Sequence, residues 1–392
     1  MSVTAPVATA PIRSHIQAIN GSRIRIVNRA AANMPDVLPL WFGEGDDPTP
    51  GFIADAAAEA AKSGKTFYAP NRGIPELREA IRRYMLRTYQ RDVAIERITV
   101  TASGMNALML ITQCLLGPGD NGVVIGPVWP NGMQAMRVMG AEPRRVDLDP
   151  TEDGGWRLDL DKLFAACDDN TRVISINSPG NPTGWMATED ELRAILDFCR
   201  QRGIWVLSDE VYSRIVYDRP FAPTFLTIAE PEDPVVIVNS FSKSWSMTGW
   251  RLGWIVAPPR LQTEIEKMTE FNISHPTTFV QHGGIAALDQ GDAYVENLVA
   301  RYGQARDMVF QRLAALPRVR LTRPEGAFYA FFALDGMSDS LAFCLKLLET
   351  AKVGLAPGIA FGDTGEGRIR LCFAASLPKL SEALDRLEPQ LR

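Results

Sequence analysis

At 392 residues, of which 46% are hydrophobic, the chain is long enough for one large domain with its own core and a smaller second domain. Its 41 basic and 46 acidic residues are mixed along the chain and give a net charge of -5, which argues against a nucleic acid or a membrane surface as partner. No uninterrupted apolar stretch approaches the roughly 18 to 20 residues of a membrane span.

Cysteines and histidines are few and scattered. The cysteines are odd in number and far apart, so we expect buried free thiols and a reducing, cytoplasmic location. They are Cys114, Cys167, Cys199, Cys344 and Cys372. The three histidines, His15, His275 and His282, lack the neighbours that a metal site needs, and we expect no metal. Residues 1–11 are small and rich in Thr, Ala and Pro, which predicts a loose arm rather than a secretion signal.

Apolar runs alternate with helical patterns over the first 290 residues. Strands are predicted at 98–100, 123–125, 173–176, 204–207, 235–238 and 254–257. Most of these runs are continuous, which is typical of strands buried on both faces. A helix is predicted at 106–115 and another at 189–202, where Thr188 and Glu191 have the spacing of a capping box. The pattern predicts an α/β fold, with a mainly parallel central sheet and helices on both of its faces.

The remainder of the chain has a different pattern. It is helical and long from 262 to 316, and this stretch includes a helix at 295–313. Short strands follow near 318–321 and 328–332, then a helix at 340–351, a strand at 368–373 and a last helix from Pro378. We interpret this tail as a smaller α+β domain. The expected division is therefore an N-terminal arm at 1–45 that belongs to the small domain, a large cofactor-binding domain at 46–290, and the C-terminal small domain at 291–392.

A polar loop at residues 240–253 follows the strand predicted at 235–238. Its one lysine, Lys243, lies between an apolar run and aromatic residues. A lysine amine condenses with an aldehyde only when part of it is unprotonated, which requires partial burial. Ser240, Ser242 and Arg251 supply the donors that a phosphate needs. Taken alone, Lys243 is more typical of a solvated surface lysine. The whole loop favours a cofactor that carries both an aldehyde and a phosphate.

Other polar segments follow predicted strands in the same way. Asn-Ser-Pro at 177–179 comes after the strand at 173–176, and Asp209 comes after the strand at 204–207. Ser103 and Gly104 open the helix at 106–115, where free backbone N–H groups suit a phosphate, although serine caps many helices. Because parallel sheets bind ligands at the carboxyl ends of their strands, we expect these segments to share one site.

Four sequence motifs occur in a fixed order along the chain. They are Tyr-Ala-Pro-Asn-Arg-Gly-Ile-Pro-Glu-Leu-Arg at 68–78, Asn-Ser-Pro-Gly-Asn-Pro-Thr-Gly at 177–184, Ser-Asp-Glu-Val-Tyr at 208–212, and the Lys243 loop. Together they resemble the fold-type I pyridoxal-phosphate enzymes, in particular the class I and II aminotransferases of the aspartate aminotransferase type. The resemblance spans nearly the whole chain. It implies pyridoxal 5'-phosphate as the cofactor, held by Lys243 as a Schiff base.

The resemblance also implies roles for residues around the cofactor ring. Asp209 would keep the pyridine nitrogen protonated, so that the ring withdraws electrons from the substrate. Tyr212 and Asn181 would hydrogen-bond the phenolic oxygen of the ring, and Trp129 would stack on its face. The phosphate would be bound by Ser103, Gly104, Met105, Ser240, Ser242 and Arg251. Plainer alternatives are a capping Asp, a core Tyr, a turn-forming Asn and a core Trp.

Three further positions match substrate or partner contacts in that family. Tyr68 would reach across a homodimer interface to the phosphate of the neighbouring subunit. Arg370 would bind the α-carboxylate of the substrate, together with Asn181. Arg368 is the competitor, since alternation along a strand puts both arginines on one face. Gly43 matches a glycine where the backbone approaches the substrate, although Gly45 replaces the proline that is common two residues later.

The resemblance implies a transaminase that moves an amino group between an L-amino acid and a 2-oxo acid by a ping-pong mechanism. Trp41, Phe42 and Trp129 predict a pocket that accepts apolar side chains. Candidates for binding the distal end of the substrate are Arg23, Arg25, Arg29 and His275. The same framework also supports β-elimination from cysteine S-conjugates, and a non-catalytic regulator that binds the cofactor is a third alternative. A regulator is disfavoured because the enzyme framework begins as early as Trp41.

Overall fold

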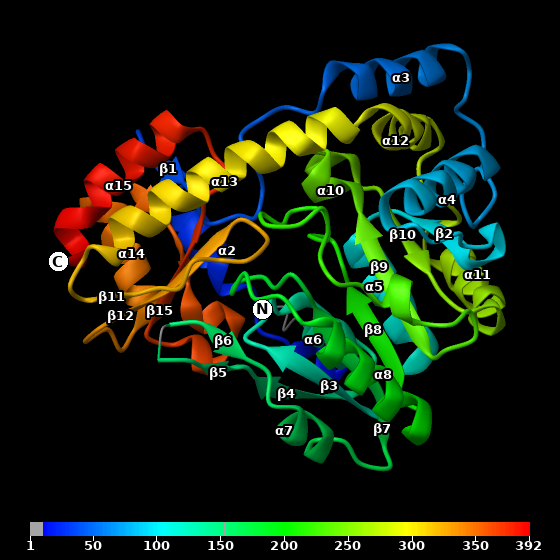
Figure 1. Ribbon diagram of the computed structural model, residues 1–392, viewed down its shortest axis with the longest axis horizontal. Helices are drawn as coiled ribbons and strands as arrows, with labels where there is room; N and C mark the ends of the chain where they lie inside the picture. The colour runs from blue at the N-terminus through cyan, green and yellow to red at the C-terminus, as the bar shows by residue number, and fades with distance from the viewer. Residues whose placement is uncertain (1–10, 153) are drawn as a thin grey trace, which may run out of the picture.

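The computed structural model of the chain describes residues 11–152 and 154–392. The expected loose arm at 1–11 lies outside the described residues apart from Pro11. Two larger sheets organise the molecule: a seven-stranded sheet, and a four-stranded sheet near the C-terminus (Figure 1).

The seven-stranded sheet has the strand order β2-β10-β9-β8-β7-β3-β4. Its strands are β2 (Ile98–Thr101), β3 (Asn121–Gly126), β4 (Glu142–Asp147), β7 (Thr171–Asn177), β8 (Trp205–Asp209), β9 (Val235–Ser240) and β10 (Gly253–Val256). Neighbours from β4 to β9 are parallel, as predicted, whereas β10 runs antiparallel to β9 and β2. The exception has a physical reason. Residues 241–252 form only short helical turns, and a parallel return would need a full crossover, usually a helix.

Alternate residues of the central strands enter two separate apolar clusters. Val123 and Ile125 belong to one cluster and Val124 to the other, because successive side chains of a strand point to opposite faces. The first cluster includes residues of α4 (Pro75–Tyr89), α8 (Glu189–Arg202) and α12 (Thr278–Gln290). The second includes residues of α5 (Gly104–Leu115), α6 (Asn131–Val138) and α11 (Pro259–Ile273). The prediction of helices on both faces is confirmed.

Helix α8 begins as its sequence predicts. Oγ1 of Thr188 accepts a hydrogen bond from the backbone N–H of Glu191 at 3.2 Å, and the carboxylate of Glu191 accepts one from the backbone N–H of Thr188 at 2.7 Å. These two bonds satisfy donors that a helix start leaves free. The helix then leads from β7 to the parallel strand β8, so the expected crossover is confirmed.

The four-stranded sheet is antiparallel and has the order β11-β12-β15-β14. Its strands are β11 (Val319–Arg320), β12 (Tyr329–Leu334), β14 (Ala356–Pro357) and β15 (Arg368–Cys372). It shares one apolar core with α2 (Arg23–Ala30), α13 (Asp292–Ala314), α14 (Ser340–Thr350) and α15 (Leu377–Leu391). The long helix α13 runs from beside α12 to this core (Figure 1).

The N-terminal segment joins the C-terminal part of the chain. Strand β1 (Leu38–Pro39) pairs in parallel with β13 (Val353–Gly354), and Ile24, Val27 and Trp41 are buried in the core of the four-stranded sheet. This arrangement supports the division expected at residues 45 and 290, which stays a prediction.

The helical stretch expected at 262–316 consists of three helices, α11, α12 and α13. The first break contains Pro276, which lacks a backbone N–H, and Gly291 separates α12 from α13. The remaining elements are α1 (Ser14–Gln17), α3 (Gly51–Lys62), α7 (Leu160–Ala165), α9 (Phe225–Ile228), α10 (Phe241–Ser244), β5 (Asp149–Pro150), β6 (Trp156–Arg157) and the short 3₁₀ helices η1 (Ile95–Arg97), η2 (Thr248–Trp250), η3 (Gly358–Phe361) and η4 (Asp363–Gly365).

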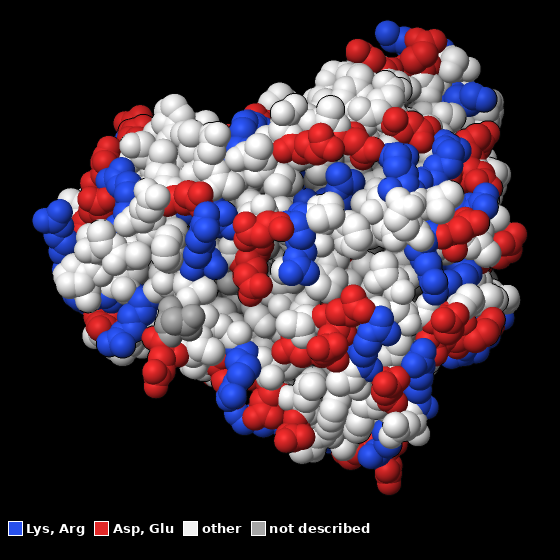
Figure 2. Space-filling model, in the orientation of Figure 1, with Lys and Arg blue, Asp and Glu red and all other residues white. Residues whose placement is uncertain are grey.

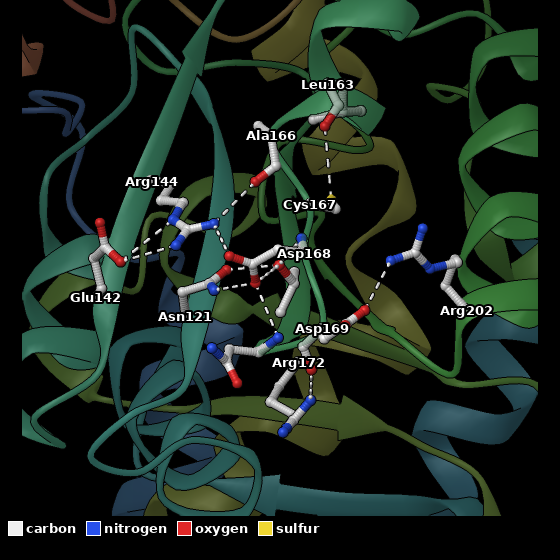
Figure 3. Close-up of polar contacts among 12 residues, drawn as sticks. Asn121, Glu142, Arg144, Leu163, Ala166, Cys167, Asp168, Asp169, Arg172 and Arg202 are labelled. Atoms are coloured by element: carbon white, nitrogen blue, oxygen red, sulfur yellow. Dashed lines mark hydrogen bonds and ion pairs between the residues drawn. The ribbon is translucent and has the colours of Figure 1, made fainter.

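A polar cluster around Asp168 joins β3, β4 and β7 (Figure 3). The carboxylate of Asp168 accepts hydrogen bonds from Nη1 of Arg144 at 2.6 Å and from Nδ2 of Asn121 at 2.8 Å. These donors, Arg144 first, hold the pKa of Asp168 well below its ordinary value. Asn121 and Thr171 begin β3 and β7, so the cluster lies at the opposite end of those strands from the loops that carry the motifs. Its role is structural.

Charges are spread over the surface. Acidic and basic side chains are interspersed over the face shown in Figure 2. Among the described residues, no helix combines the length and the apolar character that crossing a bilayer requires.

Candidate active site

A cleft of about 460 Å³ lies where the carboxyl ends of β7, β8 and β9 face the four-stranded sheet. Of the predicted site residues, all but Ser103 and Tyr68 line it. They are Gly43, Gly104, Met105, Trp129, Asn181, Asp209, Tyr212, Ser240, Ser242, Lys243, Arg251 and Arg370. Residues far apart in the sequence therefore meet in one place, as the rule for parallel sheets requires.

Lys243 projects from α10, directly after β9. Its Nζ donates a hydrogen bond to the backbone carbonyl of Gly43 and lies 5.9 Å from the ring centre of Tyr212. Burial lowers the pKa of Lys243 to about 8, and the positive charge of Arg370 acts in the same direction. A fraction of the amine is therefore neutral near physiological pH, which is the state that attacks an aldehyde.

Asp209 ends β8 and faces the same cleft. Burial raises the pKa of Asp209 to about 6, while the backbone N–H of Val211 and the charge of Lys243 act against the rise. The next residue, Glu210, is buried on the other side of the strand and accepts hydrogen bonds from Ser208 and Thr224. Glu210 thereby fixes the backbone that presents Asp209, and a cationic group bound beside Asp209 would restore its charge.

Two asparagines connect the ends of β7 and β8. Nδ2 of Asn177 donates to the backbone carbonyl of Asp209 at 3.0 Å, and Oδ1 of Asn177 accepts from the backbone N–H of Asn181 at 2.9 Å. The backbone N–H of Trp129 in turn donates to the carbonyl of Asn181 at 2.8 Å. These bonds hold the loops of three strands in one arrangement, which orients the side chains that face the cleft.

Hydrogen-bond donors that suit a phosphate lie together near the start of α5. Gly104 and Met105 open this helix and line the cleft beside Ser240, Ser242 and Arg251. Helix starts present free N–H groups and a positive dipole end, so this donor set suits a phosphate. Ser103 directly precedes this helix. Its Oγ caps the helix by accepting a hydrogen bond from the backbone N–H of Asn106 at 3.0 Å, and the residue is absent from the lining of the cleft.

The two competing arginines of β15 have different surroundings. Arg370 lines the cleft and is 2% exposed. Its Nη1 donates to Oδ1 of Asn181 at 2.8 Å, and its buried Nε has no hydrogen-bond partner in the part of the chain that the structure describes. Arg368 instead stacks on the ring of Trp156, with 4.5 Å from Cζ to the ring centre. The depth of the two positions, which alternation along a strand does not reveal, distinguishes them. Of these two arginines, Arg370 alone lines the cleft.

Tyr68 lies away from the cleft of its own chain. It is 92% exposed, and its ring packs edge-on against His275 at 5.5 Å. His275 does not line the cleft of its own chain. Of the four candidates for that contact, only Arg25 lines the cleft, from α2.

The chain matches the family model of the class I and II aminotransferases over residues 35–387. The chain belongs to this family. It is 36% identical to an aspartate aminotransferase of Pyrococcus horikoshii over 97% of each chain, and 36% identical to a probable aspartate/prephenate aminotransferase of Aquifex aeolicus over 91% of each. Among solved structures, an alanine aminotransferase of Pyrococcus furiosus superposes with a TM-score of 0.91 at 28% identity, covering 97% of this chain and 99% of that one.

The family match confirms that the chain is a transaminase with the fold class that the motifs implied. It gives no support to β-elimination or to a regulator as the main function. Among the described residues of this aminotransferase, no group of three or more His, Cys, Asp or Glu side chains is arranged to hold a metal.

Sequence reasoning missed Tyr329, and it placed the segment of Asn177 at the site without giving Asn177 a role. Tyr329 begins β12 and lines the cleft, where its hydroxyl lies 2.6 Å from the hydroxyl of Tyr212. The sequence around it, Gly-Ala-Phe-Tyr-Ala-Phe-Phe at 326–332, predicts an apolar strand and contains no sign that one hydroxyl faces the site. Asn177 belongs to the motif at 177–184, and its position after a parallel strand is the signal that could have identified it.

Proposed function

We propose that the chain uses pyridoxal 5'-phosphate to move an amino group between an L-amino acid and a 2-oxo acid in a ping-pong cycle. The observation that carries the proposal is the meeting of Lys243, Asp209 and the donors of α5 in one cleft. The lowered pKa of the lysine suits reaction with an aldehyde. The carboxylate suits a protonated pyridine nitrogen, and the helix start suits a phosphate.

Each part of this set has a task. Gly104, Met105, Ser240, Ser242 and Arg251 would hold the phosphate, while Trp129 would cover one face of the ring. Asp209 would keep the ring nitrogen protonated, and Tyr212 with Asn181 would bond the phenolic oxygen. When bound, the cofactor supplies an aldehyde that takes up the substrate amine and a cationic ring that withdraws electrons from Cα.

The residues of the chain then orient the substrate and move its proton. Arg370 and Asn181 would bind the α-carboxylate, because the Nε of Arg370 has no hydrogen-bond partner among the described residues. Once its amine is free, Lys243 would take the Cα proton as general base and return it on the cofactor side. Gly43 has no side chain, so its backbone would approach the substrate closely. Its carbonyl oxygen accepts a hydrogen bond from the Lys243 amine.

A homodimer with shared active sites is part of the proposal. Exposed aromatic residues lie near the start of α12 and at the end of α11, which precedes it. Oγ1 of Thr278 donates a hydrogen bond to the backbone carbonyl of Phe67 at 2.7 Å. Phe67 is 81% and Phe271 77% exposed, besides Tyr68. Single exposed aromatics are common, whereas several together are typical of an interface. If a second copy of the chain binds at this surface, Tyr68 of each copy would lie toward the cleft of the other copy. The cytoplasmic location stays a prediction, supported by five free cysteines.

The wall of the cleft supports a broad choice of substrate. Phe42, Met105, Leu108 and Trp129 line it, and these side chains favour apolar amino acids. Arg25 adds a cation, which favours acidic amino acids as well. The relatives named above act, by their names, on aspartate, prephenate or alanine.

A half-reaction screen tests the proposal. The purified protein is loaded with pyridoxal phosphate and mixed in turn with each standard amino acid, and loss of the yellow colour is followed by absorbance. We expect colour after loading and loss of it with several amino acids, together with formation of the matching 2-oxo acid. A protein that stays colourless after loading would contradict the proposal. Release of pyruvate and ammonia from cystathionine as the faster reaction would favour β-elimination instead.

A further inference from the structure

Two tyrosine hydroxyls form a pair at the inner end of the cleft. The Oη atoms of Tyr212 and Tyr329 lie 2.6 Å apart, and the two side chains are 3% and 0% exposed. Tyr212 follows β8 in the large sheet, whereas Tyr329 begins β12 of the four-stranded sheet. The bond therefore joins the two sheets at the site.

The surroundings of Tyr329 hold its hydroxyl in place. Cζ of Arg370 lies 4.5 Å from the centre of its ring. A Cβ atom built at Gly43 would lie only 1.9 Å from Oη of Tyr329, so a side chain at position 43 would collide with the hydroxyl. Tyr329 thus contacts the arginine expected to bind the substrate and the backbone that faces Lys243.

The direction of the bond follows from the number of protons. Each hydroxyl has one proton to donate. If Tyr212 gives its proton to the phenolic oxygen of the cofactor, it has none left for Tyr329, and Tyr329 must be the donor of the pair. Burial raises the pKa of Tyr212, and the bond from Tyr329 lowers it. Burial also raises the pKa of Tyr329, and the same bond adds to that rise.

We infer that Tyr329 is a positioning residue, an inference that rests on the proposed function. Its hydroxyl donates a hydrogen bond to the hydroxyl of Tyr212 and so makes Tyr212 a stronger hydrogen-bond donor to the cofactor. Hydrogen bonds in a chain polarise one another, and the effect is strongest in a site with little water. The phenolic oxygen and the Lys243 nitrogen share one proton. A stronger hydrogen bond donated to the oxygen stabilises its negative charge and so lowers the affinity of the pair for that proton. The bound cofactor then loses that proton at a lower pH.

The test is a pH titration of the colour of the loaded protein in four forms: wild type, Y329F, Y212F and the double variant. We expect Y329F to raise the pKa of the colour change by about 0.3 to 1 unit, the size of one hydrogen bond. Y212F is expected to raise it further. In the Y212F background, Y329F is expected to add nothing, because Tyr329 acts through Tyr212.

Y217F is the matched control. The hydroxyl of Tyr217 is part-buried and donates to the backbone carbonyl of Ala327, but Tyr217 does not line the cleft. We expect Y217F to titrate like the wild type. G43A provides a second route to the same result, because the added methyl group displaces the Tyr329 hydroxyl and leaves both tyrosines in the chain.

The outcomes separate the inference from the proposed function. A yellow wild type whose pKa is unchanged in Y329F and G43A would overturn the inference alone, as would a Y329F effect of full size in the Y212F background. A wild type that stays colourless after loading would overturn the proposed function and this inference with it.

Discussion

Nη1 of Arg370 donates a 2.8 Å hydrogen bond to Oδ1 of Asn181, so the four-stranded sheet and the loop after β7 are joined at the floor of the cleft. Both residues are almost fully buried, with 2% and 7% of their surface exposed. The guanidinium is held in advance in the orientation that a carboxylate would need, which reduces the entropy lost on binding.

The first prediction concerns this arginine. R370K should lower kcat/KM about 10- to 100-fold, because a lysine cannot make the paired hydrogen bonds of a guanidinium. The change should fall mainly on KM, measured by steady-state kinetics with an amino acid and a 2-oxo acid. R368K is the matched control and should stay within about twofold, since Arg368 stacks on Trp156 and does not line the cleft. Equal losses in the two variants would contradict the assignment of the carboxylate to Arg370.

The second prediction concerns Lys243. K243A should lower the rate of transamination at least about 10³-fold, because both the covalent link and the general base are lost. The phosphate donors remain, so the variant should still retain cofactor through gel filtration. K267A is the control, since Lys267 is exposed and pairs with Glu264, and it should be as active as the wild type. Normal turnover by K243A would refute the mechanism.

The third prediction concerns pH. The pKa of Lys243 is lowered from 10.5 to about 8, so the rate at which cofactor-free protein turns yellow with pyridoxal phosphate should rise with pH and level off above about 8. Between about 8 and 10.5 the unfolded chain binds more protons than the folded chain, and the contribution of Lys243 to the free energy of unfolding should increase with pH in that window. Rapid-mixing absorbance measures the first effect. A midpoint near 10.5 would show that the amine is solvated.

The fourth prediction concerns Tyr68. Mixing inactive Y68A with inactive K243A should restore activity, because one of the two sites in a mixed dimer then combines Lys243 of one chain with Tyr68 of the other. With random exchange, about a quarter of the wild-type activity is expected. The double variant Y68A/K243A, mixed with K243A, is the control and should stay inactive. Absence of any recovery after subunit exchange has been demonstrated by native mass spectrometry would exclude the shared site.

The fifth prediction concerns the choice of substrate. R25M should lower kcat/KM for aspartate about two- to tenfold relative to phenylalanine, because the exposed cation that attracts the second carboxylate is lost. The ratio of the two kcat/KM values is the measurement. R29M on the same helix is the control, since Arg29 does not line the cleft, and its ratio should match the wild type. A ratio unaffected by R25M would mean that acidic substrates are bound elsewhere.

Local patterns were enough for much of the fold. Continuous apolar runs predicted the central strands because a strand buried on both faces has no polar side to show. The capping pair Thr188 and Glu191 predicted the start of α8 because its two hydrogen bonds join residues three apart. The antiparallel direction of β10 was missed, since it depends on how residues 241–252 return rather than on the composition of the strand.

The same limit applies to the site. The sequence by itself determined the family, the Lys243 loop and the order of the motifs, because these depend on residue types at fixed spacing along the chain. Only the tertiary structure distinguished Arg370 from Arg368, showed that the Ser103 hydroxyl caps α5, and brought Tyr329 to Tyr212. These relationships are distances across two sheets between residues up to hundreds of positions apart. Such distances are set by packing depth and by the meeting of separate strands, and no local pattern records them.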